Sequence, residues 1–390
     1  MERSGMMKKY RILYYAWDEY TMKDAITELQ RLGHEIIIAK DSYRQYDQDE
    51  EFIASIVKKI KEYNIDLVFS FNYYPDLSRA AMLAEVLYVS WCFDSPLLTL
   101  QSLTLSNPCN RVFLFDRSNC EQLQQEGFSN VFYMPLACNV SRLEQLFAQE
   151  SVSYEHEISF IGSLYDDKYN FYKQINYLPD YLKGYLDAAM EAQLPIYGYD
   201  MVRHLLRDDI VEKILQYVQL DMGKQYRNCA RDILINMVQK QITVNERRRL
   251  LTVLGEHYLL DLYSPAKPEG IPVRYRGIAE YEQQMPRIFR NSKINLNITL
   301  RTIQSGLPLR IIDILGAGGF LLTNYQAELP EYFENGKNLV WYESYEELFE
   351  LVDYYLNHES QRETIAENGH RIVKEQFSYE VLLQRILSKI

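Results

Sequence analysis

Short apolar stretches alternate with amphipathic stretches through the first 140 residues of this 390-residue chain. The apolar stretches have the length and the β-branched and aromatic content of buried strands, and they cover residues 10–16, 34–39, 65–71, 88–93, 111–115 and 131–135. Between the first two, Met22, Ala25, Ile26 and Leu29 recur at helical spacing. Strands that alternate with helices form a parallel sheet covered on both faces. We therefore expect residues 1–140 to form one doubly wound α/β domain.

The second part of the chain repeats this alternation after a polar stretch, residues 141–157, which we predict to be an inter-domain linker. Further strands are expected at 158–161, 258–263, 273–276, 294–298, 320–323 and 338–341. Residues from about 167 to 249 have a helical pattern rich in Tyr, Leu and charge. We predict a second doubly wound domain over 158–375 that carries this helical insertion, followed by a C-terminal helix in 376–390.

Residues 306–324 combine a loop, a short helix, a glycine-rich turn and a buried strand, in the sequence GLPLRIIDILGAGGFLLTN. Arg310 lies in the first turn of that helix and Asp313 follows three residues later, among apolar neighbours. Charges on an apolar helix are costly without a partner. A nucleotide diphosphate bound at the start of the helix would be such a partner for Arg310. Asp313 could then accept hydrogen bonds from ribose hydroxyls. The alternative is an intrahelical ion pair.

This stretch resembles the sugar-nucleotide site of GT-B glycosyltransferases, in particular the CgeB-type (spore-maturation-protein-like) "glycosyl transferases group 1" family. That family has an R-x-x-E helix, a small-residue turn with glycine and an apolar strand that ends in Thr-Asp or Thr-Asn. Here the pattern is Arg310-x-x-Asp313, residues 316–319 and then Thr323-Asn324. The following segment, ELPEYFENG, also fits.

The chain departs from the family pattern at two positions. The acid of the helix is Asp where the family usually has Glu, which shortens its reach. Many retaining relatives carry a second Glu eight positions earlier, where this chain has Ser305. The resemblance therefore leaves open whether the reaction inverts or retains the configuration of the sugar.

The resemblance implies a GT-B-like α/β fold of two Rossmann-like, doubly wound parallel-sheet domains that face each other across a cleft. The implied reaction moves a hexose or N-acetylhexosamine from a nucleotide-diphosphate sugar, with UDP the expected nucleotide, to a hydroxyl of a protein, a cell-surface glycan or a small molecule. No metal or cofactor is expected. The C-terminal helix would return to the first domain. A sugar-nucleotide epimerase, a retaining transferase and a non-catalytic scaffold remain alternatives.

Seven residues of the second domain are candidates for the donor site, namely Gly162, Arg301, Arg310, Asp313, Thr323, Asn324 and Glu328. Gly162 directly follows a strand, where a glycine lets the backbone approach a phosphate. Arg301 lies beyond the carboxyl end of another strand, where ligands bind in such sheets. A solvated loop arginine is the alternative for Arg301, and simple strand termination is the alternative for Thr323 and Asn324.

The first domain offers candidates for the acceptor side. Asp94 ends a strand before Ser95 and Pro96, and would remove the acceptor proton in an inverting enzyme. An Asx turn that closes the strand is the alternative. Asn72 and Tyr73 follow the third strand at the same edge and could contact the acceptor, or could form a polar loop with an aromatic anchor.

Composition excludes several other classes of protein. The net charge of −12 argues against nucleic acid as the main partner. No run of about 18 apolar residues is present to span a membrane, and residues 1–9 lack an apolar signal core. The five cysteines form no C-x-x-C pair, which is typical of reduced thiols in a cytoplasmic protein. Dinucleotide G-x-G-x-x-G and Walker A motifs are absent. Assembly into a homo-oligomer is left open.

Overall fold

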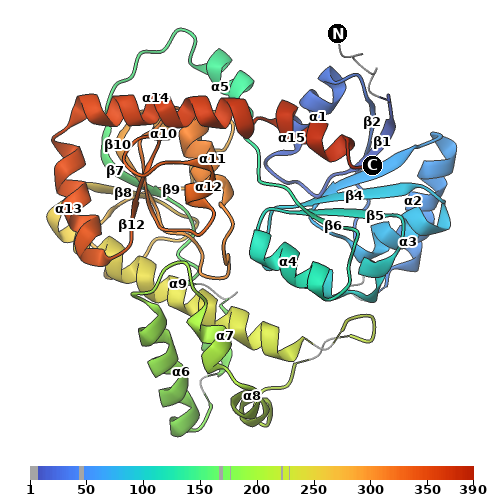
Figure 1. Cartoon of the computed structure of the whole chain (residues 1–390), viewed down its shortest axis with the longest axis horizontal. Coiled ribbons are helices and arrows are strands. Elements are labelled where there is room, and N and C mark those ends of the chain that lie inside the picture. Colours follow the sequence, from blue (N-terminus) through green and yellow to red (C-terminus); the bar gives the residue numbers. More distant parts are fainter. Residues whose placement is uncertain (1–7, 44–47, 167–169, 176, 221–222, 228) are drawn as a thin grey trace. The chain divides into compact units, whose positions relative to one another are not determined.

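The structure is a computed structural model that describes residues 8–43, 48–166, 170–175, 177–220, 223–227 and 229–390. Its contacts divide the chain into two compact units (Figure 1). Unit 1 comprises Met1–Pro135, Met222–Asn228 and Tyr379–Ile390, and unit 2 comprises Leu136–Asp221 and Cys229–Ser378. Both units are therefore built from chain segments that are far apart in the sequence.

Among the described residues, unit 1 holds a six-stranded parallel sheet in the order β2-β1-β3-β4-β5-β6. Its strands are β1 (Arg11–Tyr15), β2 (Glu35–Ala39), β3 (Leu67–Phe71), β4 (Leu87–Cys92), β5 (Asn110–Leu114) and β6 (Val131–Tyr133). Its helices are α1 (Met22–Arg31), α2 (Glu50–Glu62), α3 (Pro75–Leu83), α4 (Arg117–Gln125) and α15 (Tyr379–Leu387), with the 3₁₀ turns η1 (Leu98–Gln101) and η2 (Leu103–Ser106). Every residue of β3 is buried, as expected for a strand covered on both faces.

The segment Met222–Asn228 belongs to unit 1 although its neighbours in sequence belong to unit 2. The Leu103 amide donates to the Gln225 carbonyl oxygen at 2.9 Å, and the Arg227 amide donates to the Gln101 carbonyl oxygen at 2.9 Å. The Arg227 side chain also pairs with Glu126 at 2.5 Å. Backbone and side chain together thus hold this segment against the rest of unit 1.

Unit 2 holds, within the described part of the chain, a second six-stranded parallel sheet in the order β12-β11-β10-β7-β8-β9. Its strands are β7 (His156–Ile161), β8 (Leu260–Tyr263), β9 (Arg274–Gly277), β10 (Ser292–Asn297), β11 (Leu321–Asn324) and β12 (Val340–Tyr342). Its helices outside the insertion are α5 (Val140–Leu146), α10 (Gln284–Arg290), α11 (Leu309–Gly316), α12 (Leu329–Tyr332), α13 (Tyr345–Leu356) and α14 (Glu359–Gln376). Counted from β7, this is the Rossmann strand order, and its direction reverses between β7 and β10.

The helical insertion consists of η3 (Phe171–Ile175), α6 (Asp180–Gln193), α7 (Met201–Leu205), α8 (Asp208–Leu215) and the long helix α9 (Ala230–His257), which runs below the sheet of unit 2 in Figure 1. It has a hydrophobic core of its own, which includes Leu182, Val202, Ile214 and Ile235. The insertion is helical as predicted. Its last helix continues to His257, beyond the predicted end near residue 249.

The predicted fold is confirmed, since both units are parallel α/β sheets flanked by helices. The boundaries differ from those predicted. The proposed linker, 141–157, contains most of α5 and the start of β7. Polar side chains hid this helix, whose residues Val140 and Leu143 are buried and whose first turn is capped by Asn139. The C-terminal helix α15 groups with unit 1 and packs against α1.

The glycine-rich turn after α11 is required by close packing. A Cβ on Gly319 would lie 2.6 Å from the Phe289 carbonyl oxygen and 2.8 Å from the Asn295 amide nitrogen. The Asn295 amide also donates to the carbonyl oxygens of Phe289 and Phe320, at 2.8 and 3.0 Å. Gly319 therefore allows α10 and the entry to β11 to approach each other.

We predict that Gly319→Ala lowers the free energy of unfolding by about 1–3 kcal/mol, because the new methyl group displaces a backbone carbonyl and its hydrogen bond. Gly184→Ala is the matched control, since Gly184 lies within α6 and a Cβ there would meet nothing within 4 Å. That change should raise stability by about 0.5–1 kcal/mol. Urea unfolding followed by circular dichroism measures both. Equal effects of the two substitutions would contradict this account.

Candidate functional site

The candidate site of unit 2 lies where the strand order reverses, at the carboxyl ends of β7 and β10. Gly162 and Ser163 follow β7, and Ile298 follows β10. The Gly162 amide donates to the Tyr263 carbonyl oxygen at 3.0 Å, so it is not free to bind a phosphate. A Cβ on Gly162 would lie 3.4 Å from the Phe160 ring and 3.8 Å from an Arg247 nitrogen. Gly162 therefore supplies space for these neighbours.

Arg247, from helix α9, joins the two loops at this point. Its guanidinium donates to the carbonyl oxygens of Ser163 and Ile298, with the Nε–Ile298 contact at 3.1 Å. The residue is 7% exposed and stacks over the ring of Phe160. These bonds go to carbonyl oxygens, and no carboxylate among the described residues forms an ion pair with the Arg247 guanidinium, although the Glu246 charge and the Tyr165 side chain interact with it. Burial lowers the pKa of Arg247 below its usual value, Tyr165 and Glu246 oppose this shift, and the charge of Arg310 adds to it.

Arg310 and Asp313 occupy the first turns of α11, as predicted. Arg310 Nη1 lies 3.8 Å from an Asp313 carboxylate oxygen, longer than a charge-assisted hydrogen bond. The same nitrogen lies 2.7 Å from the Met285 sulfur, and the guanidinium stacks on the ring of Phe289. Asp313 is buried and accepts from the Tyr281 hydroxyl at 3.4 Å. The intrahelical pair is thus loose, and the Arg310 side chain remains 26% exposed.

Arg301 has a different role from the predicted contact with a diphosphate. Its Nε and Nη2 donate to the Glu246 carboxylate, each at 2.7 Å. Its remaining contacts are the carbonyl oxygens of Ile196 and Leu194, at 2.6 and 2.8 Å, and the ring of Tyr197. Although burial alone would lower the pKa of Arg301, Glu246 raises it above the usual value. Arg301 therefore anchors the insertion to the sheet.

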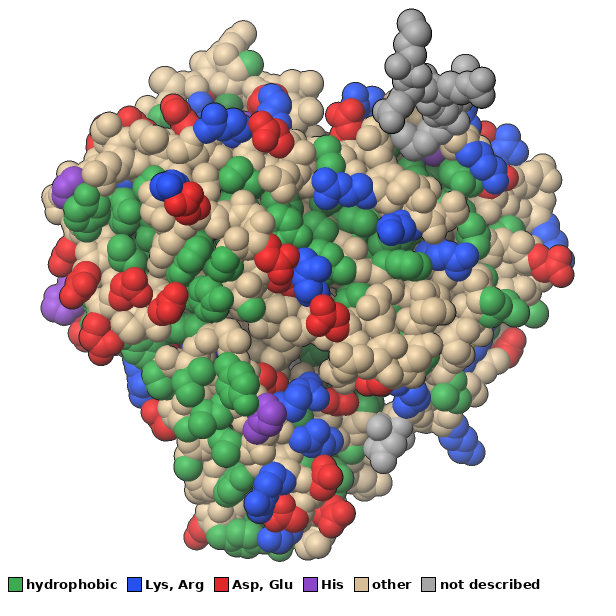
Figure 2. Space-filling model, viewed as in Figure 1, with side chains coloured by type: hydrophobic (Ala, Val, Ile, Leu, Met, Phe, Trp, Pro, Cys, Tyr) green, Lys and Arg blue, Asp and Glu red, His purple; other side chains and the backbone are tan. Residues whose placement is uncertain are grey.

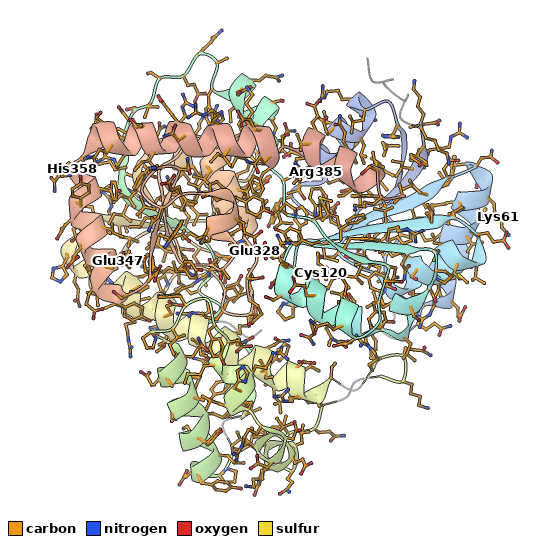
Figure 3. All side chains as sticks on the ribbon, in the orientation of Figure 1. Lys61, Cys120, Glu328, Glu347, His358 and Arg385 are labelled. Carbon is orange, nitrogen blue, oxygen red and sulfur yellow. The ribbon has the colours of Figure 1, made fainter. Side chains whose placement is uncertain are left out.

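Thr323, Asn324 and Glu328 shape the surrounding loops. The Asn324 side-chain oxygen accepts from the Thr299 amide at 2.7 Å, and the Thr323 hydroxyl accepts from the Asn297 amide group at 2.9 Å. Glu328, labelled in Figure 3, precedes α12. It is fully buried and accepts a hydrogen bond from the Ser305 hydroxyl at 2.8 Å. Thr323 and Asn324 thus hold the loop that follows β10.

In unit 1, the side chains of Asn72 and Asp94 are in contact. The Asn72 amide nitrogen donates to the Asp94 carboxylate at 2.7 Å, and the Asn72 side-chain oxygen accepts from the Phe93 amide at 2.9 Å. Burial raises the pKa of the Asp94 carboxyl above its usual value, and the hydrogen bond from Asn72 opposes that rise. Although neighbouring groups partly desolvate its carboxyl, the Asp94 residue remains accessible to solvent. A partly accessible carboxylate with a raised pKa is suited to accept a proton.

Tyr73 does not line the same edge, contrary to prediction. It is 1% exposed, and its hydroxyl contacts the Thr104 hydroxyl at 2.8 Å and the Asn110 amide at 3.2 Å. The alternative interpretation, an aromatic anchor, describes it correctly. Its burial excludes direct contact with an acceptor in this structure.

The part of the chain that the structure describes contains no cluster of His, Cys, Asp and Glu that could hold a metal ion. It also contains no helix with the length and apolarity that a bilayer crossing requires. On the face drawn in Figure 2, the described Lys and Arg side chains are mixed with Asp and Glu. This mixture differs from the one-sign basic surface that nucleic-acid binding requires.

Comparison with known proteins adds two sequence matches. Residues 236–388 match the model of a family described as glycosyl transferase-like. A protein of Aquifex aeolicus (strain VF5), described as uncharacterized, is 21% identical over 366 residues, which is 86% of this chain and 85% of that protein. The family match covers the predicted donor residues of α11 and β11.

Solved structures decide the fold. A glycosyltransferase from Rickettsia africae ESF-5 superposes with a TM-score of 0.52 at 13% identity, covering 98% of both chains. Sucrose-phosphate synthase from Thermosynechococcus elongatus gives 0.51 at 11%, covering 97% of both. Anabaena HepE in complex with UDP-glucose gives 0.52 at 11%, covering 97% of this chain and 99% of that one. The fold is GT-B. Membership of the CgeB-type subgroup within GT-B stays a prediction.

We predict that Glu246→Gln lowers the free energy of unfolding by about 3–5 kcal/mol, because it leaves the buried Arg301 charge uncompensated. Glu150→Gln is the control. Glu150 pairs with Arg287 at 2.7 Å, but both side chains are 37% exposed, so its loss should leave the stability almost unchanged. Urea unfolding compares the two variants. A loss for Glu246→Gln no greater than for Glu150→Gln would show that Arg301 finds compensation elsewhere.

We also predict that Asn72→Gly raises the pKa of Asp94 further, since the lost hydrogen bond favours the charged carboxylate. Glycine accommodates the positive φ of 59° at this position without strain. The measurement is a pH titration of the carboxyl carbon by NMR in ¹³C-Asp-labelled protein, with Asp94→Asn to assign the signal. Asn130→Ala, which removes an amide bonded to the Leu105 carbonyl, should leave the titration unchanged. A lower or constant pKa in Asn72→Gly would refute the assignment.

Proposed function

We propose that this protein is a glycosyltransferase that moves a hexose or N-acetylhexosamine from a nucleotide-diphosphate sugar to an acceptor hydroxyl. The observation that carries the proposal is the pair of arginines, Arg247 and Arg310, at the switch point of the unit 2 sheet. One is buried without a carboxylate among its described hydrogen-bond partners, and the other makes only a loose ion pair. A diphosphate would offer both guanidinium groups anionic oxygens as hydrogen-bond acceptors.

Each group has a proposed part in the reaction. As the acceptor oxygen attacks the sugar carbon, the bond from that carbon to the diphosphate breaks, and negative charge grows on the leaving group. Arg247, Arg310 and the start of α11 would stabilise this charge without a metal ion. Asp313 would bind ribose hydroxyls, whereas the fully buried Glu328, which was expected to bind sugar hydroxyls, would hold the Ser305 loop in place through its hydrogen bond. Asn324 and Thr323 would act through the loop that they hold.

The acceptor proton needs a base, and we propose Asp94 of unit 1 for an inverting reaction. The raised pKa of Asp94 lies closer to neutral pH than that of an ordinary Asp, and a general base is most effective when its pKa is near the working pH. Asn72 would position the carboxylate through its hydrogen bond. The proposed nucleotide is UDP, supported by the GT-B neighbour HepE, whose structures are described as complexes with UDP and glucose and with UDP-glucose.

The test is a thermal shift of the purified protein against UDP, GDP, dTDP, ADP and CDP. A ligand that binds the native state raises the melting temperature by mass action, and we expect UDP to do so. Arg247→Met and Arg310→Ala should each weaken UDP binding about tenfold to hundredfold, because each removes a charged contact. Arg249→Met is the matched control, since Arg249 is exposed on the same helix and lies 3.5 Å from Glu191.

The outcomes separate the alternatives. No stabilisation of the folded protein by any diphosphate, or equal losses in Arg249→Met and Arg247→Met, would contradict the donor site. Incubation with UDP-glucose and a panel of glycan and small-molecule acceptors then tests catalysis. Isomerised donor without transfer would indicate an epimerase, whereas tight UDP binding without turnover would favour a scaffold.

A further inference from the structure

The amino-terminal edge of the unit 2 sheet contains a cavity of about 250 Å³. Ser292, the first residue of β10, and Phe320, just before β11, line it from the sheet. Arg362, Ala366 and His370 line it from α14. Because β10 runs from Ser292 to Asn297, the cavity is separated from the carboxyl ends of the strands by roughly 16 Å of strand. It is therefore distinct from the proposed donor site.

The cavity contains a buried cation whose hydrogen bonds are incomplete. Arg362 is 1% exposed, and its Nη1 donates to the carbonyl oxygens of Tyr355 and Leu356. Its Nε and Nη2 have no hydrogen-bond partner among the described residues. Nη2 lies 3.7 Å from a carboxylate oxygen of Glu359, a side chain that is 63% exposed. Buried N–H groups without acceptors are costly, and more so on a charged side chain.

A second arginine lines the same space. Arg290 borders this cavity and an adjoining one of about 180 Å³, and its buried Nε also lacks a hydrogen-bond partner among the described residues. Its guanidinium stacks over Phe147, which holds it in place. His370 lines both cavities and contacts the Gly316 carbonyl oxygen through Nδ1 at 2.9 Å. Two guanidinium groups thus border one cavity, and each has a buried N–H group without an acceptor among the described residues.

We propose that this cavity binds the phosphate group of a small phosphate ester. The unused donors of Arg362 and Arg290 match the oxygens of a phosphate group. Tyr154 and Phe320 offer an aromatic wall to the body of the ligand, and the Arg362 guanidinium stacks over the Tyr154 ring at 5.4 Å. Glu363 and Glu367 are exposed at the cavity and would accept hydrogen bonds from hydroxyl groups. This combination favours a phosphorylated sugar over an uncharged one.

The test is a thermal shift of the full chain with inorganic phosphate and, separately, with glucose 6-phosphate, each with and without saturating UDP. At ten times the dissociation constant we expect the melting temperature to rise by about 1–3 °C. The rise should persist with UDP present and in Arg310→Ala, because the two sites are separate. A larger rise with glucose 6-phosphate than with phosphate at equal concentration would identify the ester as the ligand. Equal rises would identify free phosphate and overturn the choice of an ester.

Variants of the cavity complete the test. Arg362→Met and Arg290→Gln should each abolish the rise caused by either phosphate probe and leave the response to UDP intact. Arg371→Met is the control, since Arg371 is exposed on the same helix and bonds to Asn368. If Arg362→Met does not fold, Arg290→Gln decides. The site would be refuted if neither probe stabilised the wild-type chain, if the rise vanished in Arg310→Ala, or if it survived in Arg290→Gln.

Discussion

The insertion is joined to the sheet of unit 2 through two adjacent residues of helix α9. Glu246 holds Arg301 in a buried ion pair, and Arg247 bonds to the loops that follow β7 and β10. A carboxylate and a cation in consecutive positions of α9 thus bind the loop that follows β10, and the cation also binds the loop that follows β7. The register of α9 against the sheet depends on both contacts, because a shift of one residue would place each charge against the wrong group. The contacts of Glu246 and Arg247 in α9 thus fix the positions of the loops at the switch point.

Apolar runs were sufficient to predict most strands and helices of the described residues, because strands buried on both faces, such as β3, leave a continuous apolar pattern in the sequence. Helix α5 escaped prediction because its buried face consists of few residues, such as Val140 and Leu143, within a polar stretch. Tyr73 was misplaced for a related reason. A tyrosine after a strand looks the same in sequence whether it faces solvent or, as here, bonds to Thr104 and Asn110 in the core.

The candidate site was harder to predict than the fold, since its charges find partners across long stretches of sequence. Arg310 and Asp313 could be found because they lie on one helical turn within an apolar context. Arg301 was assigned to a ligand because its partner Glu246 lies 55 residues away in the insertion. Arg247 was missed because it is one of three consecutive arginines, and only its burial sets it apart from Arg248 and Arg249. The run of three arginines within one predicted helix was the available sign that one of them could be buried.

The interleaving of the two units has a consequence for how the chain matures. Unit 1 takes its last helix from Tyr379–Ile390, and Tyr379 packs its ring against the buried Trp91 with centroids 5.9 Å apart. It also takes the segment Met222–Asn228 from the middle of the chain. During synthesis the N-terminal sheet therefore leaves the ribosome first but waits for the final residues before its core is covered. Until then, Trp91 lacks its contact with Tyr379, and unit 2 itself lacks its last residues up to Ser378.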